Sequence, residues 1–148
     1  MKKQLKIDAV KQAPHLIWNS FIDVIARNYS EIEDNQRSAH LVFLYDVEVQ
    51  NGGHMQYFEN HRATRLNETM QALMLLGANC QATILEDAGR QFLSKKRKII
   101  RSIFEYVEIA REGEFNLFDQ RYHQCTPDLT LCLQAHLHNH LPDYIEFV

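Results

Sequence analysis

The stretch Leu41-Val-Phe-Leu-Tyr-Asp-Val-Glu-Val49, with the Asn51-Gly52-Gly53 that comes soon after it, decides between two kinds of fold. Its β-branched and aromatic residues are typical of a strand, and Asn-Gly is a strong hairpin signal. However, Leu41, Leu44 and Tyr45 share one face of a helix, and the residues after the glycines do not alternate cleanly. We therefore favour a helix, a turn at Asn51-Gly52-Gly53 and a short helix through Asn60.

Apolar residues recur at helical spacing in most of the remaining chain. Glycine and proline lie at the ends of these apolar segments, as they commonly do at the ends of helices. The pattern predicts an all-α fold: a single compact multi-helical domain of about six to eight helices over residues 1–148. The expected helices include one that starts at Pro14, one that ends at Gly77, one that closes near Gly89, one over roughly 95–112 with Ile99, Ile100, Ile103, Phe104 and Val107 on its apolar face, and one opened by Pro127-Asp128 and ended by Pro142.

Two segments between these helices carry weaker signals. Ser30-x-x-Glu33 has the form of a capping box at a helix start. Phe115 to Tyr122 holds three aromatic residues and is expected to be a loop or a short turn.

Composition sets the broad class of the protein. The chain has 148 residues, of which 45% are hydrophobic and 24% charged, as in one globular domain. Its longest apolar runs are five residues, against about 20 for a membrane helix, so we expect no membrane partner. Lys2 and Lys3 are followed by polar residues, which disfavours secretion. Cys80, Cys125 and Cys132 are an odd, sparse set that suits a reducing cytoplasm.

Charge is distributed unevenly along the chain. The net charge of −3 is too mild to imply a partner, but residues 90–101 carry six cations and no acid. Residues 102–148 carry eight acids and two cations. Such patches can steer a charged partner, although a solvated helix surface explains them as well.

The usual signatures of metal sites and of catalysis are missing. Cys132, His136 and His140 are spaced i, i+4 and i+8, so the outer two lie about 12 Å apart on a straight helix and cannot share one ion. There is no His-Glu-x-x-His, Cys-x-x-Cys, Gly-x-Ser-x-Gly or phosphate-binding glycine loop. We expect no metal, no cofactor, no catalytic residues and no enzyme.

The cations of residues 90–101 could grip phosphates. Phe92 is the only aromatic residue nearby, so no platform for base stacking is evident. Direct nucleic-acid binding is therefore disfavoured against a solvated face or a protein contact.

The strongest candidate for a partner-binding surface is a strip of carboxylates. On the helix expected over 95–112, the acids fall roughly opposite Ile99, Ile103 and Val107. A ridge of carboxylates can present itself to a basic surface as phosphates do, although it can also be the wet side of an amphipathic helix. The candidate partner-binding residues are Glu105, Glu108, Glu112, Glu114 and Asp119.

One motif carries a family resemblance: Glu48-Val-Gln-Asn51-Gly52-Gly53-His-Met-Gln56-Tyr57-Phe58-Glu-Asn60. With Leu73-Met-Leu-Leu-Gly77-Ala78 and a Phe-x-x-x-Asp-x-x-Tyr element at 115–122, it resembles a bacterial DNA-mimic-protein-like family, a domain of unknown function. The resemblance covers about 38–146. It implies an all-helical, cytoplasmic non-enzyme that binds a helix-turn-helix transcription factor through acidic surface.

The chain departs from that family picture in its mild net charge and in its cationic segment. The motif itself has two interpretations: a scaffold in which its polar side chains satisfy groups freed at a helix break, or a binding site. The second interpretation leads to an alternative function, a small-molecule or metal-dependent enzyme centred on Glu48, Asn51, His54 and Gln56. The oligomeric state stays open.

Overall fold

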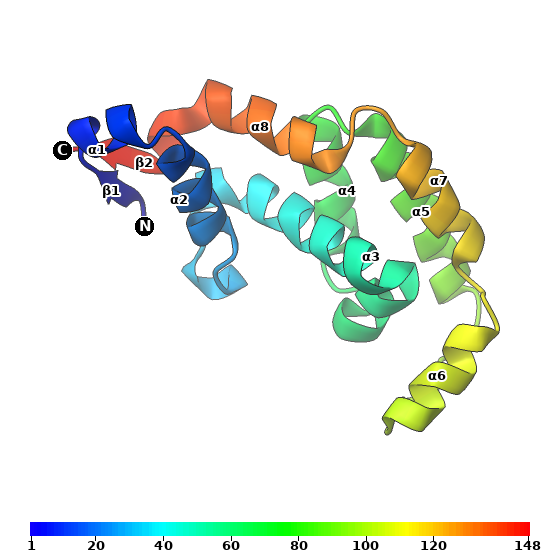
Figure 1. Cartoon of the computed structure of the whole chain (residues 1–148). Coiled ribbons are helices and arrows are strands. Elements are labelled where there is room, and N and C mark those ends of the chain that lie inside the picture. The colour runs from blue at the N-terminus through cyan, green and yellow to red at the C-terminus, as the bar shows by residue number, and fades with distance from the viewer.

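The computed structural model describes all of residues 1–148, and helices make up most of it (Figure 1). The prediction of an all-α fold is confirmed. None of the helices combines the length and the apolar character needed to cross a bilayer. The eight α-helices are α1 (Ile7–Gln12), α2 (His15–Ile25), α3 (Arg37–His61), α4 (Leu66–Leu75), α5 (Asn79–Leu93), α6 (Ile103–Arg111), α7 (Asn116–Gln124) and α8 (Leu129–His140), joined by the 3-10 turns Tyr29–Glu31, Asp34–Gln36 and Leu141–Asp143.

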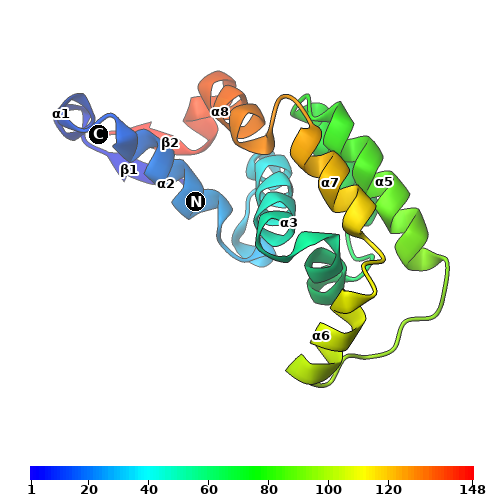
Figure 2. The same ribbon diagram turned by 45° about the vertical axis from the view of Figure 1, so that its right-hand side comes forward.

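Helix α3 is the central element of the fold. Helices α2, α4, α7 and α8 contact it, and α5 packs against α4 and α7 (Figures 1 and 2). Tyr45 and Phe58 of α3 are completely or almost completely buried, as are Leu73 of α4 and Leu85 of α5. Apolar burial of this kind is the main source of the domain's stability.

The predicted break in α3 lies at the two glycines. Gly52 has φ −150° and ψ 19°, and Gly53 has φ 71° and ψ −174°, so the helical path is interrupted and then resumes. The strand alternative for this stretch is thereby excluded, and the helix–turn–helix prediction is confirmed.

The two chain ends form a small sheet that the sequence did not reveal. Strand β1 (Lys3–Leu5) pairs in parallel with β2 (Ile145–Phe147), with Lys3 opposite Ile145. The sheet lies at the end of the molecule where both termini are found (Figure 1). Tyr144, next to β2, is completely buried and meets the ring of Phe21 edge-on at 4.8 Å.

Both predictions for the segments between the expected helices are wrong. The capping boxes join Asn28 to Glu31 and Glu33 to Gln36, one before and one after the predicted Ser30–Glu33 pair. The segment expected to be a loop over 115–122 is mostly helix α7, which buries Tyr122. Its aromatic residues have helical spacing, and packing against α3 and α5 makes use of it.

The helix predicted over 95–112 begins only at Ile103. Arg97 holds the preceding segment in an irregular path, because its guanidinium donates to the backbone oxygens of Phe92 (3.0 Å) and Gln91 (2.9 Å) at the end of α5. The Ser102 side chain then caps α6 by accepting from the backbone N–H of Glu105. The expected apolar face of this helix is exposed rather than packed on the core.

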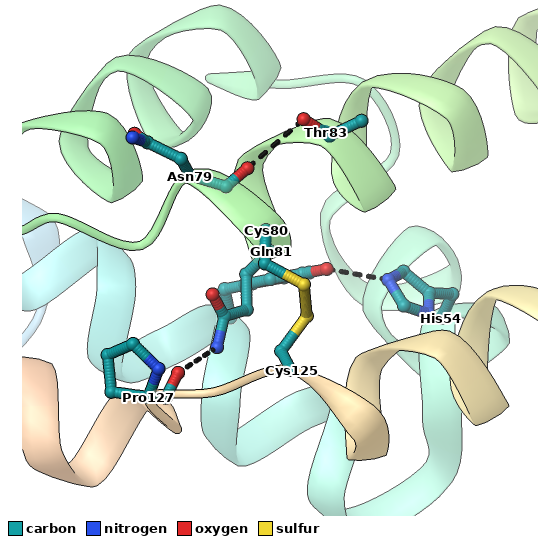
Figure 3. The surroundings of a disulfide bond; sticks show 8 residues. His54, Asn79, Cys80, Gln81, Thr83, Cys125 and Pro127 are labelled. Atoms are coloured by element: carbon teal, nitrogen blue, oxygen red, sulfur yellow. Dashed lines mark hydrogen bonds between the residues drawn. A yellow bond between two sulfur atoms is a disulfide. The ribbon is translucent and has the colours of Figure 1, made fainter.

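Two of the three cysteines are joined in a disulfide bond, Cys80–Cys125 (Figure 3). It links the start of α5 to the residue that follows α7, and Gln81 beside it donates to the Pro127 backbone oxygen at 2.8 Å. Only Cys132 is free, and it is buried. Because disulfides are rare in reducing compartments, the cysteine count no longer argues for the cytoplasm.

Candidate functional site

The polar residues of the Asn-Gly-Gly motif bind one another across the break in α3. The Glu48 carboxylate accepts from Gln56 Nε2 at 3.2 Å and from Asn60 Nδ2 at 2.7 Å. Asn51 Nδ2 in turn donates to Gln56 Oε1 at 3.2 Å. These bonds fasten the second half of α3 to the first, as the scaffold interpretation expects.

Both glycines are required by close contacts at the break. The φ of 71° with ψ of −174° at Gly53 belongs to a region that essentially only glycine adopts. A Cβ atom at Gly53 would also collide with the Asp119 carboxylate. A Cβ at Gly52 would collide with the side chain of Gln56.

A buried chain of hydrogen bonds begins where α3 resumes. The Asp119 carboxylate accepts from the backbone N–H of His54 at 2.8 Å and lies 2.7 Å from His54 Nδ1. His54 Nε2 lies 2.6 Å from the Tyr45 hydroxyl. With Nδ1–H donating to the carboxylate, Nε2 accepts the Tyr45 proton. The order of acid, imidazole and hydroxyl is that of a nucleophilic triad, but Tyr45 and His54 are fully buried, and burial raises the pKa of Tyr45 well above its usual value.

A second contact joins the same two helices. The Tyr122 hydroxyl donates to the Asp46 carboxylate, and burial together with that carboxylate raises the pKa of Tyr122. The rings of Tyr45 and Tyr122 meet edge-on at 5.6 Å. Asp119 and Tyr122 therefore both attach α7 to α3, and no local signal paired them with residues so distant in the sequence. The Phe-x-x-x-Asp-x-x-Tyr element of the family resemblance did contain both.

A cleft of about 900 Å³ opens beside Gly52. Its walls are the second half of α3, the segment between α5 and α6, and α6 itself. Met55, Phe58 and Phe92 are among the apolar residues that line it. All five acids predicted to bind a partner also line this one cleft: Glu105, Glu108, Glu112, Glu114 and Asp119.

Two of these five acids are half-buried and hold side chains of other parts of the chain. Asp119 holds His54, as described above. Glu114 forms a two-pronged ion pair with Arg97 and accepts from Gln91 Nε2 at 2.8 Å. These contacts lower the pKa of Glu114 to about 2. Both carboxylates therefore anchor the chain around α6.

The other three acids are exposed, Glu105 and Glu108 on α6 and Glu112 directly after its last residue. Glu105 accepts from the backbone N–H of Arg101 at 2.8 Å, and Glu108 pairs with Arg111 at 3.2 Å. Glu112 makes no hydrogen bond or ion pair with another side chain. Exposed pairs of this kind are weak, so all three carboxylates are accessible to a partner.

The cationic segment over 90–101 is only partly neutralised. Arg90 pairs with Glu86 and Asp87, while Lys95 and Arg97 pair with Glu114. Lys96, Lys98 and Arg101 remain exposed without a carboxylate partner. The cleft consequently carries charges of both signs.

No group of three or more His, Cys, Asp or Glu side chains is placed to hold a metal ion. Of the residues weighed for such a site, His136 lies 2.7 Å from the Tyr144 hydroxyl and His140 lies 3.6 Å from Asp143. Burial and the neighbouring His140 lower the pKa of His136 to about 4.

Comparison with known proteins identifies the family. No curated protein and no solved structure matches the chain. Residues 30–146 match the model of a family described as DMP19-like protein. The matched region spans most of the chain and contains the break in α3, the cleft and the contacts of α7. The chain therefore belongs to the DMP19-like protein family.

Proposed function

We propose that this protein is a non-catalytic, DNA-mimic-like interaction protein that binds a basic DNA-binding protein, such as a helix-turn-helix repressor. The observation that carries the proposal is the position of Glu105 and Glu108 on α6, and of Glu112 at its end, exposed beside the cleft. A row of carboxylates attracts cationic side chains that otherwise hold DNA phosphates.

Further acids strengthen the negative field beside α6. Glu59 lines the cleft from α3. The pKa of Tyr106 is raised by burial and then by the carboxylates of Glu59, Glu48 and Asp119, which disfavour a negative phenolate there. The same carboxylates attract a cationic side chain that enters the cleft.

The geometry of the motif supports a non-catalytic role. Glu48, Asn51 and Gln56 bind one another, and the Asp119–His54–Tyr45 chain ends on a hydroxyl that no substrate reaches. The enzyme alternative would need at least one of these groups free to contact a ligand.

Direct nucleic-acid binding is a second candidate, favoured by the unpartnered Lys96, Lys98 and Arg101. Against it, the acids that share the cleft with these cations would repel phosphates. It predicts retention on duplex DNA that is lost when Lys96 and Lys98 are replaced by alanine.

The test is capture of proteins from a lysate of the source cells on the immobilised chain, followed by elution with salt. The captured protein is expected to be a DNA-binding protein. A duplex that carries its operator sequence should compete with the immobilised chain and release it. A variant with Glu105→Gln, Glu108→Gln and Glu112→Gln should bind it about tenfold more weakly and with a flatter salt dependence, since three screened contacts sum to about 1.4 kcal/mol.

The matched control removes three acids elsewhere: Asp8→Asn, Asp23→Asn and Glu86→Gln. It changes the net charge equally and should leave the affinity unchanged. If both triple variants bind alike, or if the operator duplex does not compete, the proposed surface is wrong. DNA retention by the protein alone would favour the second candidate.

A further inference from the structure

A second cavity, of about 290 Å³, shares no residue with the cleft beside α6. Its walls are the segment that follows α2, both halves of α3, and the connection from α3 into the first turn of α4. The break in α3 therefore brings residues from its two halves together in this cavity. Pockets that hold small molecules range from about 300 to 1,000 Å³, so this one has room for a compact ligand.

His40 lines this cavity and has a hydrogen-bonding atom without a partner. The residue is 1% exposed, and its Nδ1 lies 2.7 Å from the Ile25 backbone oxygen at the end of α2. Because a carbonyl oxygen only accepts, Nδ1 carries the proton, and Nε2 on the opposite side of the ring has a free lone pair. Nε2 is buried and meets no donor of the protein. Buried polar atoms without a partner are rare and costly, so this one calls for a donor from outside the chain.

The cavity is lined by cationic side chains and by no carboxylate. Arg65 makes no ion pair, and its guanidinium carbon lies over the ring of Tyr29, 3.6 Å from the ring centre. The only hydrogen bond of the Arg27 side chain runs from Nη1 to the Met1 backbone oxygen at 3.2 Å. Both guanidinium groups are therefore free to pair with an anion.

The same cations act on His40. Burial has the largest effect on its pKa and lowers it, the hydrogen bond to Ile25 opposes this, and Arg65, Arg37 and His61 lower the pKa further. The imidazole is consequently neutral at pH 7, and its Nε2 accepts a hydrogen bond.

Two carboxylates lie close to the cavity without lining it. Glu48 is 3.7 Å from His61 Nε2, which is too long for a hydrogen bond, and Glu68 accepts from the Tyr29 hydroxyl at 3.1 Å. No third His, Cys, Asp or Glu joins His40 and His61 in a group that holds a metal ion. The arginines also repel a cation, so the chemistry of the cavity favours an anion.

We propose that this cavity binds a small organic anion that carries a hydroxyl group, such as a hydroxy acid or a polyol phosphate. The anionic group pairs with Arg65 and Arg27, and the hydroxyl donates to Nε2 of His40. Tyr57 and Leu44, which also line the cavity, contact the carbon skeleton. An anion without a hydroxyl leaves Nε2 unpaired, and an ammonium group is repelled by the arginines. The inference is independent of the proposed repressor binding, because the cavity and the cleft share no residue.

Isothermal titration calorimetry of the full chain with three-carbon probes tests both parts of this recognition. Glycerol 3-phosphate and glycerate carry an anion and hydroxyls, propyl phosphate and propionate carry only the anion, and glycerol carries only hydroxyls. At least one of the first two should bind about tenfold or more tightly than its counterpart without hydroxyls, because that counterpart leaves His40 Nε2 unpaired. Glycerol should not bind. The tighter of glycerol 3-phosphate and glycerate identifies the anionic group as phosphate or carboxylate.

Two arginine variants test the anionic half of the site. Arg65→Gln should weaken binding of the tighter probe about tenfold, because a charge-assisted hydrogen bond is lost. The matched control is Arg62→Gln. Arg62 belongs to the same connection, also has a positive φ and makes no ion pair, but it lines the cleft instead of the cavity. This control should leave the affinity unchanged.

His40→Phe tests the other half of the site, because it removes Nε2 and should abolish the preference for probes with hydroxyls. It also removes the bond to Ile25, so thermal melting must show that the variant is folded. If it is not folded, the probe pairs and the arginine variants decide the question. The proposal is overturned if no probe binds at millimolar concentration, if probes with and without hydroxyls bind alike, or if Arg62→Gln weakens binding as much as Arg65→Gln does.

Discussion

Replacing Asp119 by alanine should lower the free energy of unfolding by about 3 kcal/mol, because it leaves two buried donors of His54 without a partner. The Asp119 carboxylate accepts from the backbone N–H of His54 at 2.8 Å and lies 2.7 Å from Nδ1. His54 is completely buried, so a donor that loses its acceptor there carries a desolvation cost. A buried donor without an acceptor costs about 1–3 kcal/mol, which gives about 2–6 kcal/mol for the pair.

That loss is large against the total stability of a domain, about 5–15 kcal/mol. It should appear in urea unfolding as a lower midpoint with an unchanged slope, and as a fall of roughly 6–12 °C in the melting temperature. Glu112→Ala is the matched control, because it removes another carboxylate that lines the cleft but that, unlike Asp119, binds no other group. The control should stay within about 0.5 kcal/mol of wild type.

A double-mutant cycle with Tyr45→Phe examines whether the buried chain acts as a unit. Tyr45→Phe removes the donor to His54 Nε2 and leaves the contact with Asp119 in place. The two substitutions should couple by about 0.5–3 kcal/mol, as neighbours in one network do. A loss below about 1 kcal/mol for Asp119→Ala, with no coupling, would show that His54 is not held as described.

Three more predictions concern stability. Gly53→Ala should cost about 2–4 kcal/mol in urea unfolding, because it forces a glycine-only conformation and a collision with Asp119; equal stability would contradict the break. Reduction of Cys80–Cys125, which are 45 residues apart, should cost about 4 kcal/mol, measured with and without dithiothreitol against Cys125→Ser, which should not respond to the reductant. In the folded state the pKa of His136 is about 4, below its usual 6.5. The neutral imidazole therefore contributes fully to the free energy of unfolding above pH 6.5, and this contribution is lost as pH falls from 6.5 towards 4. Between pH 7 and 4.5, His136→Gln should lose about 1–2 kcal/mol less than wild type, and parallel profiles would refute this.

Features that depend on neighbouring residues could be predicted from the sequence. Asn51-Gly52-Gly53 marked the break in α3, because the dihedral angles at Gly53 exclude other residues. Pro127-Asp128 marked the start of α8, where the Asp128 side chain accepts from the backbone N–H of Leu131. The helical wheel placed Glu105, Glu108 and Glu112 together, since that arrangement is a property of a single helix.

Features that depend on residues distant in the sequence could not be predicted. The roles of Asp119 and Glu114 are set by His54 and Arg97, which lie 65 and 17 residues away in sequence. The same holds for the disulfide and for the pairing of β1 with β2. The prediction for α6 was wrong for a different reason. The spacing of Ile103, Phe104 and Val107 indicates an apolar helix face, but it does not show whether the rest of this chain packs on that face.

The break in α3 has a consequence for the position of α6. It aims the His54 N–H at Asp119 and so fixes α7, whose first residue lies only five residues after the end of α6. Glu114, between these helices, is fixed by Arg97 from the segment on the other side of α6. Both ends of α6 are thus tied to the body while the helix itself is free. Arg97→Gln would release this tie without changing a residue of α6, so it should weaken the proposed binding of a basic DNA-binding protein while urea unfolding still shows a folded core.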